Sequence, residues 1–530
     1  MLKIYRGIQQ PMLRLKTAIK NLAALTGAVG VAASFAAGCG GGSSNGNNTG
    51  NYQLPLGSFV APGTTPYTLA NMSSRSACTV NAHQNGRARW TVLVYINAAN
   101  NLQPYSLVNV AQMASVGSNA DLNIVLQWKQ TTPSQSLYFN SVPIQTTPSF
   151  VGTRRYLLKK HTPAEINAIA PPNITTNPAL QGNTTSLDPD RLADPPTNTI
   201  NDNGVMTSDM GDYRALKDFV TWGTTNYPAD HIAVVLWDHG SGALNVINRS
   251  ALHDSKKPVG TVTTRSSAKS TTRGLSQDCA TGNQISTPQV PLAFVGAAQP
   301  IDAVVVDCSL QGTTEMAYEL RNSARVYVAS EESPPGLGYP YDTWLNYLQN
   351  NVAGPCDLGA NLISATMATY PSSTNITQSM TDLSKMSAVG TALNAFGVQL
   401  ANNEMGISAL LKTDRQAAQY FDFPEYKDLY HFADIVRRNS IAPAALQTAA
   451  GNVENALIGT NGAILMSAHS TLADGTGFSE QYACGLSIFL PGPLEQSSVD
   501  NTTGFDPAWS TLALSAAAPS WAIYLQGQQQ

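Results

Sequence analysis

The sequence predicts an α/β fold: a mostly parallel sheet with helices on both faces, followed by a mainly helical C-terminal part. Two observations predict it. Short apolar, β-branched runs recur with little polar alternation, which is typical of strands covered on both faces. Between these runs lie segments whose apolar residues repeat at helical spacing. The 530 residues, 43% of them hydrophobic, are enough for a large core.

The strands are predicted from five apolar runs and one later run. Residues 90–96 read W-T-V-L-V-Y-I, with no break in the apolar character. Such a run fits a strand buried on both faces rather than one with a solvent-exposed face. The other predicted strands cover residues 122–126, 232–236, 303–306, 326–329 and 484–490.

The helices are predicted from spacing. In residues 212–224, Leu216, Phe219 and Val220 stand at i, i+3 and i+4, which places them on one helical face. Residues 314–321 show the same pattern. Three more helices are predicted after Pro355, over residues 380–400, 407–418 and 426–438.

Two stretches interrupt the alternation of strands and helices. Residues 171–209 are rich in Pro, Asn and Thr, and residues 243–273 are rich in Ser, Thr, Lys and Arg. Polar stretches of this length inside a folded domain are typical of surface insertions.

The N-terminal segment is predicted to be an export signal. Basic residues precede an apolar stretch of about 16 residues, which is short for a spanning helix. The stretch ends in Ala36-Ala37-Gly38-Cys39, which resembles the lipobox of bacterial lipoproteins, although Ala36 departs from the usual larger residue and leaves ordinary cleavage open. We therefore expect a signal peptide over residues 1–38, a lipid on Cys39, and a flexible linker over residues 39–87. The expected location is the bacterial cell envelope, on its periplasmic or its surface face.

The charge balance excludes a nucleic-acid partner. Lys and Arg number 30 against 34 Asp and Glu, so the formal net charge is −4. Nucleic-acid binding needs clustered basic residues, which this balance does not provide.

The cysteines set a limit on disulfides. Of the six, Cys39 is reserved for the lipid, so five remain and at most two disulfides can form. None of the cysteines forms a Cys-x-x-Cys pair, so no zinc or redox spacing is present. At least one thiol is expected to stay unpaired.

Chemically useful side chains follow two of the predicted strands. His239 follows residues 232–236, and Cys308 and Ser309 follow residues 303–306. Ligands of an open α/β sheet bind at the carboxyl ends of its strands. A thiol or hydroxyl facing an imidazole there is the minimum for covalent acyl transfer, with His239 moving the proton. Gly240, which has no side chain, lets its backbone N–H approach a developing oxyanion.

From residue 88 onward the sequence resembles the clostripain family of cysteine peptidases, which share the caspase-like fold. The resemblance is carried by residues 90–102, by residues 226–242, which end in W-D-H-G-S-G, and by residues 273–294. It implies a caspase-like catalytic domain over residues 88–354 with the two insertions, a C-terminal part of the same unit over residues 355–495, and a tail over residues 496–530. It also places the family histidine on His239.

The resemblance breaks at the nucleophile. Family members usually read Asp-Ala-Cys-Leu-Met-Gly, whereas residues 307–312 read D-C-S-L-Q-G. The ungapped flanks place Asp307 on the family aspartate and Ser309, not Cys308, on the family cysteine. Because a slip of one residue in an extended segment turns a side chain to the opposite face, Cys308 serves only if the turn is rebuilt. Three outcomes stay open: Cys308 as nucleophile, Ser309 as nucleophile, or an inactive peptide-binding lipoprotein.

The resemblance also suggests the substrate. In the family, the aspartate at Asp307 lies in the pocket for the residue before the scissile bond and favours Arg or Lys there. The leading hypothesis is thus an endopeptidase that cleaves polypeptides after basic residues by Cys–His catalysis. The family prototype depends on calcium, so calcium enters by resemblance only. No metal ligand is assigned, and no other cofactor is predicted.

Overall fold

The centre of the fold is a twisted, mostly parallel sheet. Within the described residues it has eight strands in the order β15-β13-β12-β11-β8-β1-β2-β5. Strands β2, β1, β8, β11 and β12 run parallel to one another, whereas β5, β13 and β15 pair antiparallel. The bounds are β1 Ala88–Ala98, β2 Leu122–Gln130, β5 Gly152–Leu157, β8 Ala229–Trp237, β11 Ile301–Asp307, β12 Ala324–Ala329, β13 Thr377–Asp382 and β15 Ile464–His469.

This computed structural model describes residues 75–132, 138–139, 142–143, 147–177, 179–196, 199–200, 206–243, 274–371, 374–470, 480–491 and 507–527. All of them lie in one compact unit, Ala37–Gln530. The predicted signal peptide, Cys39 and nearly all of the predicted insertion at residues 243–273 lie outside the described residues.

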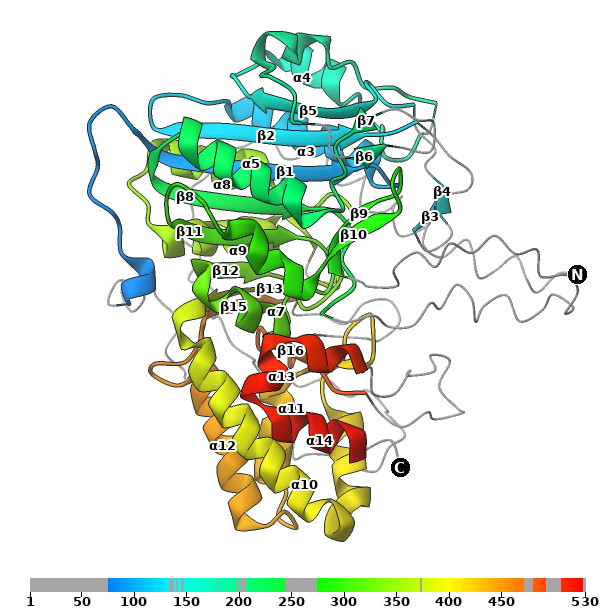
Figure 1. The fold of residues 1–530 in the computed structure, drawn as a ribbon, viewed down its shortest axis with the longest axis vertical. Helices are drawn as coiled ribbons and strands as arrows, with labels where there is room; N and C mark the ends of the chain where they lie inside the picture. The colour runs from blue at the N-terminus through cyan, green and yellow to red at the C-terminus, as the bar shows by residue number, and fades with distance from the viewer. Residues whose placement is uncertain are drawn as a thin grey trace, which may run out of the picture. The chain divides into compact units, whose positions relative to one another are not determined.

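Helices cover both faces of the sheet (Figure 1). On one face, Val92, Val235 and Val305 pack with α3, α8 and α9; on the other, Val234 and Val304 pack with α5 and α7. Burying each such valine contributes about 1.5–3 kcal/mol, which explains the nearly continuous apolar strands. The helices are α3 Gln103–Val116, α4 Pro163–Ile169, α5 Tyr213–Asn226, α7 Thr314–Glu319, α8 Tyr341–Asn350 and α9 Pro355–Thr369.

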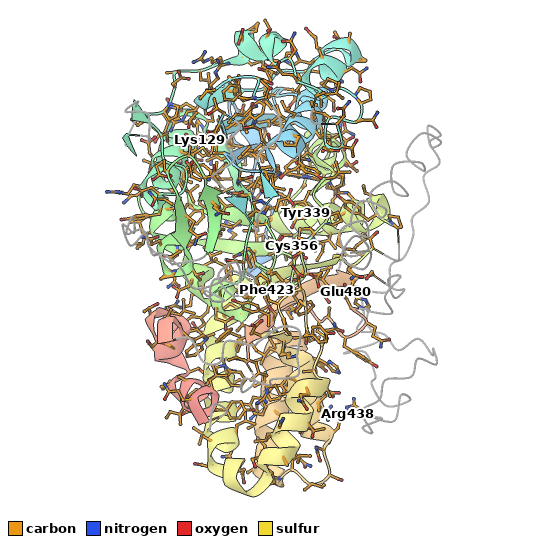
Figure 2. The ribbon with its side chains drawn as sticks, turned by 90° about the vertical axis from the view of Figure 1, so that its right-hand side faces the viewer. Lys129, Tyr339, Cys356, Phe423, Arg438 and Glu480 are labelled. Carbon is orange, nitrogen blue, oxygen red and sulfur yellow. A yellow bond between two sulfur atoms is a disulfide. The ribbon has the colours of Figure 1, made fainter. Side chains whose placement is uncertain are left out.

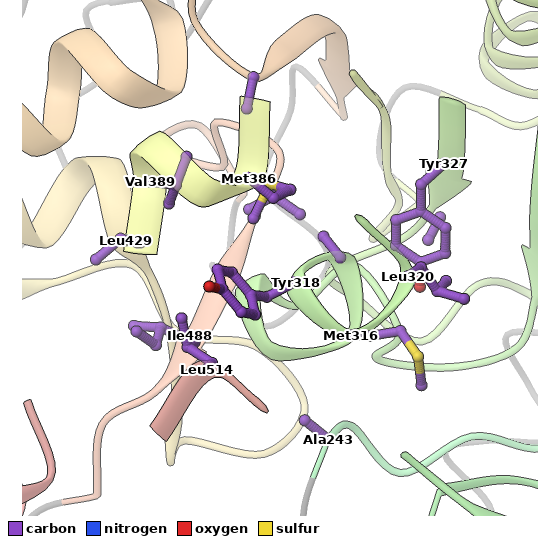
Figure 3. Packing of buried hydrophobic residues seen from close by; sticks show 14 of the residues in the cluster. Ala243, Met316, Tyr318, Leu320, Tyr327, Met386, Val389, Leu429, Ile488 and Leu514 are labelled. Carbon is purple, nitrogen blue, oxygen red and sulfur yellow. The ribbon is translucent and has the colours of Figure 1, made fainter. Parts of the chain in front are cut away.

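The C-terminal part is mainly helical and shares its core with the second face of the sheet. Figure 3 shows Tyr318 and Met316 of α7 in the same cluster as Met386, Val389 and other residues of the C-terminal part. The helices are α10 Met386–Ala417, α11 Leu429–Arg438, α12 Ala444–Ile458, α13 Ala513–Ala517 and α14 Pro519–Gly527. The last of these packs along α10, and a side chain at Gly397 of α10 would strike the backbone of Trp521.

The short elements complete the described fold. They are η1 Ser76–Cys78, β3 Tyr138–Phe139, β4 Val142–Pro143, η2 Thr185–Asp190, β6 Thr199–Ile200, β7 Met206–Thr207, β9 Gly274–Asp278, β10 Asn283–Ser286, η3 Thr287–Phe294, η4 Leu320–Asn322, η5 Leu383–Lys385, β14 Tyr426–Asp428, β16 Ser487–Phe489 and η6 Pro507–Thr511.

The α/β class predicted from the sequence is confirmed, and so are the five strands of the first part. Residues 401–406, which lie between two predicted helices, are helical within α10, and the kink of this helix lies at Ile407 (φ −135°, ψ 25°). The helix start predicted at Met380 is wrong: Thr377–Asp382 is strand β13, which pairs with β12. Its polar sequence, T-Q-S-M-T-D, gives no apolar run from which a strand is predicted.

Candidate active site

The two strands that carry the predicted site residues are direct neighbours. Strands β8 and β11 pair in parallel, and Trp237 stands opposite Asp307. The paired register ends at these two residues, and His239 and Ser309 each follow it by two positions. The carboxyl ends of both strands therefore bring an imidazole and a hydroxyl to the same edge of the sheet.

Cys308 lies on the other face from this pair. Side chains alternate along a strand, and Cys308 belongs with Val304, Val306 and Leu236 in the core cluster under α7. It is 1% exposed, and its Sγ lies 3.6 Å from the carbonyl oxygen of Leu236. Burial raises the pKa of the Cys308 thiol well above its usual value, so it stays neutral. In this structure Cys308 is a core residue.

Ser309 begins a tight turn after β11. The next residue, Leu310, has φ +61°, a left-handed angle that is rare for a bulky residue. The turn is held by Leu310 N–H donating to Glu332 O at 3.3 Å and by Gly312 N–H donating to Ser330 O at 2.6 Å. A side chain at Gly312 would lie 2.7 Å from the backbone of Ser330, so only glycine allows this approach. Ser309 itself is half-buried.

His239 is held by an asparagine. Its Nε2 lies 2.6 Å from Oδ1 of Asn101. Because an amide oxygen only accepts hydrogen bonds, this contact assigns the proton to Nε2 and leaves Nδ1 as the basic nitrogen. Burial lowers the pKa of His239 to about 3, so the ring is neutral at physiological pH.

Asn100 secures the residue before the histidine. Its Nδ2 donates to Oδ1 of Asp238 at 2.5 Å and to the carbonyl oxygen of Gln277 at 3.1 Å. Burial raises the pKa of Asp238 well above its usual value. Asn100 and Asn101 follow strand β1, the neighbour of β8. The signal that marks His239, a polar residue just after a buried strand, is also present at the end of β1, where it marks Asn100 and Asn101.

Strand β9, which supplies Gln277, is fixed by a buried ion pair. Nζ of Lys129 donates to Oδ2 of Asp278 at 2.5 Å and to the carbonyl oxygen of Ser208 at 2.8 Å. Both charged side chains are almost fully buried. Figure 2 labels Lys129 in the sheet part of the molecule. The pair therefore fixes the chain that supports Asn100.

Gly240 lies against the Ser309 turn. A side chain there would meet the Ser309 carbonyl oxygen at 2.2 Å, Nε2 of Gln311 at 2.8 Å and Cβ of Cys308 at 3.1 Å. Nε2 of Gln311 reaches three carbonyl oxygens, those of Gly274 at 3.3 Å and of Gly242 and Ser309 at 3.5 Å. One amide thus joins the histidine loop, the start of β9 and the Ser309 turn.

Asp307, the last residue of β11, is a buried carboxylate beside this edge. Its Oδ2 accepts hydrogen bonds from the backbone N–H of Tyr339 at 3.1 Å and from the hydroxyl of Tyr341 at 3.0 Å. Burial raises its pKa to about 6. Among the described residues, no basic side chain contributes to this shift, which is opposed only by the two hydrogen bonds.

The expectation of at least one unpaired thiol is confirmed. Cys78 and Cys356 form a disulfide across 278 residues of sequence, and Cys279 and Cys308 are free thiols. Cys356 is labelled in Figure 2. Cys39 lies outside the described residues.

Neither a metal centre nor a spanning helix is found in the part of the chain that the structure describes. No group of three His, Cys, Asp or Glu side chains there is placed to hold a metal ion, so no described residue is assigned to calcium. In the same described ranges, no helix is both long enough and apolar enough to cross a bilayer.

Comparison with known proteins identifies one family. The model of the clostripain family matches residues 94–501. Clostripain of Hathewaya histolytica is 21% identical over 487 residues, which span 83% of this chain and 82% of that protein. Two solved structures share the fold. An inactive zymogen C11 protease from Parabacteroides distasonis has a TM-score of 0.52 at 15% identity, with 82% of this chain and 99% of that chain covered. A secreted C11 cysteine protease from Bacteroides thetaiotaomicron has a TM-score of 0.51 at 12% identity, with the same coverage of 82% and 99%.

Proposed function

Because this chain belongs to the clostripain family of cysteine peptidases, we propose that it is an endopeptidase that cleaves polypeptides after Arg or Lys, with Ser309 and His239 as the reacting pair. The register of β8 and β11 carries the proposal. It pairs Trp237 with Asp307, so that residues 239 and 309 each follow the paired ends by two positions, next to the buried carboxylate of Asp307. The family match supports the hydrolase class, and the geometry supports the assignment of roles.

The proposed reaction uses the ordinary steps of acyl transfer. Oγ of Ser309 attacks the scissile carbonyl carbon while its proton passes to Nδ1 of His239. The backbone N–H of Gly240 is the proposed donor to the oxyanion. His239 then returns the proton to the leaving amine, and water hydrolyses the acyl ester in the same way. A serine hydroxyl ionises far less readily than a thiol, so we expect slow turnover.

Cys308, the nucleophile favoured by the sequence analysis, is the less favourable choice. Its sulfur belongs to the opposite face and is almost fully buried. Using it requires the turn after Asp307 to be rebuilt so that residue 308 faces His239. The strained angle at Leu310 and the tight contact at Gly312 oppose such a change.

A second candidate function is peptide binding without cleavage. It is favoured by one observation: burial lowers the pKa of His239 to about 3, which makes its ring a weak base for a serine hydroxyl. In that case Asp307 still recognises a basic side chain, and no bond is broken.

Active-site labelling distinguishes these alternatives. The full protein is incubated with a peptidyl phosphonate and a peptidyl acyloxymethyl ketone, each with Lys or Arg before the reactive group, and the adduct is mapped by mass spectrometry. An adduct on Ser309 supports the proposal. An adduct on Cys308 supports the rebuilt turn. Peptide binding with no adduct supports the second candidate.

Two variants sharpen the labelling experiment. His239→Ala must abolish labelling, since no base remains. Ser309→Cys restores the family's thiol at the same position, and we expect ketone labelling to accelerate by about tenfold or more. If Ser309→Cys stays inert while it still binds peptide, the pairing of residues 239 and 309 is not catalytic.

We also propose export to the bacterial envelope with a lipid on Cys39. The proposal rests on the charged start, the short apolar stretch and the Ala-Ala-Gly-Cys ending. Mass spectrometry of the mature N-terminus tests it, because acylation adds the mass of lipid chains to Cys39. Release of a Cys39→Ser variant from membranes is the expected companion result; an unmodified Cys39 would contradict the anchor.

A further inference from the structure

The hydrogen bonds at Asp307 are unequal on its two oxygens. Oδ2 accepts from the Tyr339 N–H and from the Tyr341 hydroxyl. Each carboxylate oxygen has about two lone-pair sites, so Oδ2 is saturated. Oδ1 accepts no hydrogen bond from the described residues. The carboxylate therefore offers a substrate one oxygen, not two.

The two donors on Oδ2 are rigidly placed. The hydroxyl of Tyr339 lies 3.0 Å from both Val306 O and Oε1 of Gln378, and Tyr339 is labelled in Figure 2. The hydroxyl of Tyr370 donates to the carbonyl oxygen of Gly338 at 2.6 Å. Gly338 has φ +63°, and a side chain there would lie 2.5 Å from Oδ2 of Asp307. The segment before Tyr341 is thus closed against the carboxylate and cannot withdraw without breaking these contacts.

The size and the donor groups of the substrate's basic side chain also matter. Asp307 is 5% exposed, and Tyr341 is fully buried. A lysine brings a compact ammonium on a slim stem, whereas an arginine brings a planar fork of five donors. The strength of arginine depends on binding both carboxylate oxygens at once. With Oδ2 filled, an arginine would make one contact and bury further donors without partners, which is unfavourable.

We infer that the hydroxyl of Tyr341 sets the specificity at Asp307 by occupying Oδ2, so that this site prefers lysine to arginine. The inference rests on the proposed function in one respect, namely that Asp307 receives the substrate's basic side chain. It goes further in naming which basic residue is preferred and which residue of this chain decides it.

Binding is measured in a variant that cannot cleave. Ser309→Ala in the full protein removes the proposed nucleophile, and fluorescence anisotropy gives the dissociation constants of three peptide amides that end in Lys, Arg or norleucine. We expect the Lys peptide to bind about tenfold more tightly than the Arg peptide. The norleucine peptide, which has the stem without the charge, is expected to bind most weakly.

The Tyr341→Phe change, added to Ser309→Ala, frees one of the two lone-pair sites of Oδ2 with almost no change of shape. We expect the Lys to Arg preference to fall about tenfold, because arginine regains its second contact. Tyr347→Phe is the matched control: Tyr347 lies on the same helix α8, and its hydroxyl is not a donor to Asp307. That control is expected to leave the preference unchanged.

Each other result overturns the inference. Equal or tighter binding of the Arg peptide contradicts it, as does a preference that Tyr341→Phe leaves intact, or a norleucine peptide that binds as well as the Lys peptide. Hydrolysis by the unmodified protein is scored separately. Lysine preference without hydrolysis removes the peptidase proposal and keeps this inference, whereas hydrolysis with arginine preference removes only this inference.

Discussion

Asn101 determines which nitrogen of His239 carries the proton, and thereby which one is the base in the proposed reaction. Its Oδ1 accepts from Nε2 at 2.6 Å, so the lone pair is left on Nδ1. The asparagine touches no substrate in the proposed reaction and acts through the histidine. Its effect should therefore appear in the tautomer of the ring as well as in the rate.

We expect Asn101→Ala to slow phosphonate labelling of Ser309 by about 10- to 100-fold, because the ring loses its fixed orientation. Nitrogen NMR of His239 should show mixed tautomers in the variant and one tautomer in the unmodified protein. Asn101→Asp, which keeps an acceptor at the same place, should retain a single tautomer. Unchanged labelling in Asn101→Ala would show that the asparagine has no positioning role.

Asp307 should make binding of basic peptides depend on pH. Burial raises its pKa to about 6, so the carboxyl is neutral below that pH and charged above it. Affinity for the Lys peptide should rise about tenfold from pH 5 to pH 7, following the ionised fraction. The norleucine peptide and an Asp307→Asn variant should show a flat profile. A rise that persists in Asp307→Asn would assign the titration to another group.

At the scale of elements, the close approach of two strand ends builds the site. Gly240 after β8 touches the turn after β11, and Gln311 of that turn reaches back to Gly242 and Gly274. The two ends are in contact through backbone atoms, which cannot move aside as a flexible side chain can. A single added methyl group should therefore separate them.

We expect Gly240→Ala to destabilise the fold by about 1–3 kcal/mol and to abolish labelling of Ser309. The new Cβ would lie 2.2 Å from the Ser309 carbonyl oxygen. Gly406→Ala is the matched control, since no atom lies within 4 Å of the Cβ it would add to α10. That change should be neutral or stabilise by up to about 1 kcal/mol. Denaturant unfolding and labelling of both variants give the comparison; equal behaviour would refute the contact.

At the scale of the whole molecule, buried acids link stability to pH. Burial raises the pKa of Glu332 to about 8 and that of Glu315 to about 7. A folded-state pKa above the unfolded value means that the native protein holds more protons, so the free energy of unfolding falls as pH rises. The buried histidines His239 and His431, each with a pKa lowered to about 3, act oppositely but only below about pH 6.5.

The free energy of unfolding should therefore decrease between pH 6.5 and pH 8, with a slope of up to about 1.4 kcal/mol per pH unit for each such acid. Glu332→Gln removes one titrating proton and should make the slope shallower. Urea unfolding at a series of pH values measures it. A free energy of unfolding that rises with pH in this range, or a slope that Glu332→Gln leaves unchanged, would exclude this assignment.

Across the whole molecule, some strands are evident from the sequence pattern and others are not. Buried parallel strands such as β8 and β11 are apolar throughout, because both of their faces are covered, so they stand out in the sequence. Strand β13 is also buried on both faces, yet it contains Thr377 and Ser379, whose hydroxyls bond to the backbone of Glu331 and Gly485, far along the chain. Its pairing with β12 is a long-range contact that no local pattern encodes.

The amino-acid sequence alone determined the α/β class, the main parallel strands and the two strand ends that carry His239 and Ser309, because these follow from apolar runs and from the residues after them. Tertiary structure decided which side of the sheet each of these side chains takes. The pairing of Trp237 with Asp307 brings the two strand ends together, and Cys308 lies in the core. The tertiary structure also brings Asn101 to His239 and Tyr341 to Asp307. These contacts join residues more than a hundred positions apart in one case and thirty-four in the other, and packing rather than local sequence sets them.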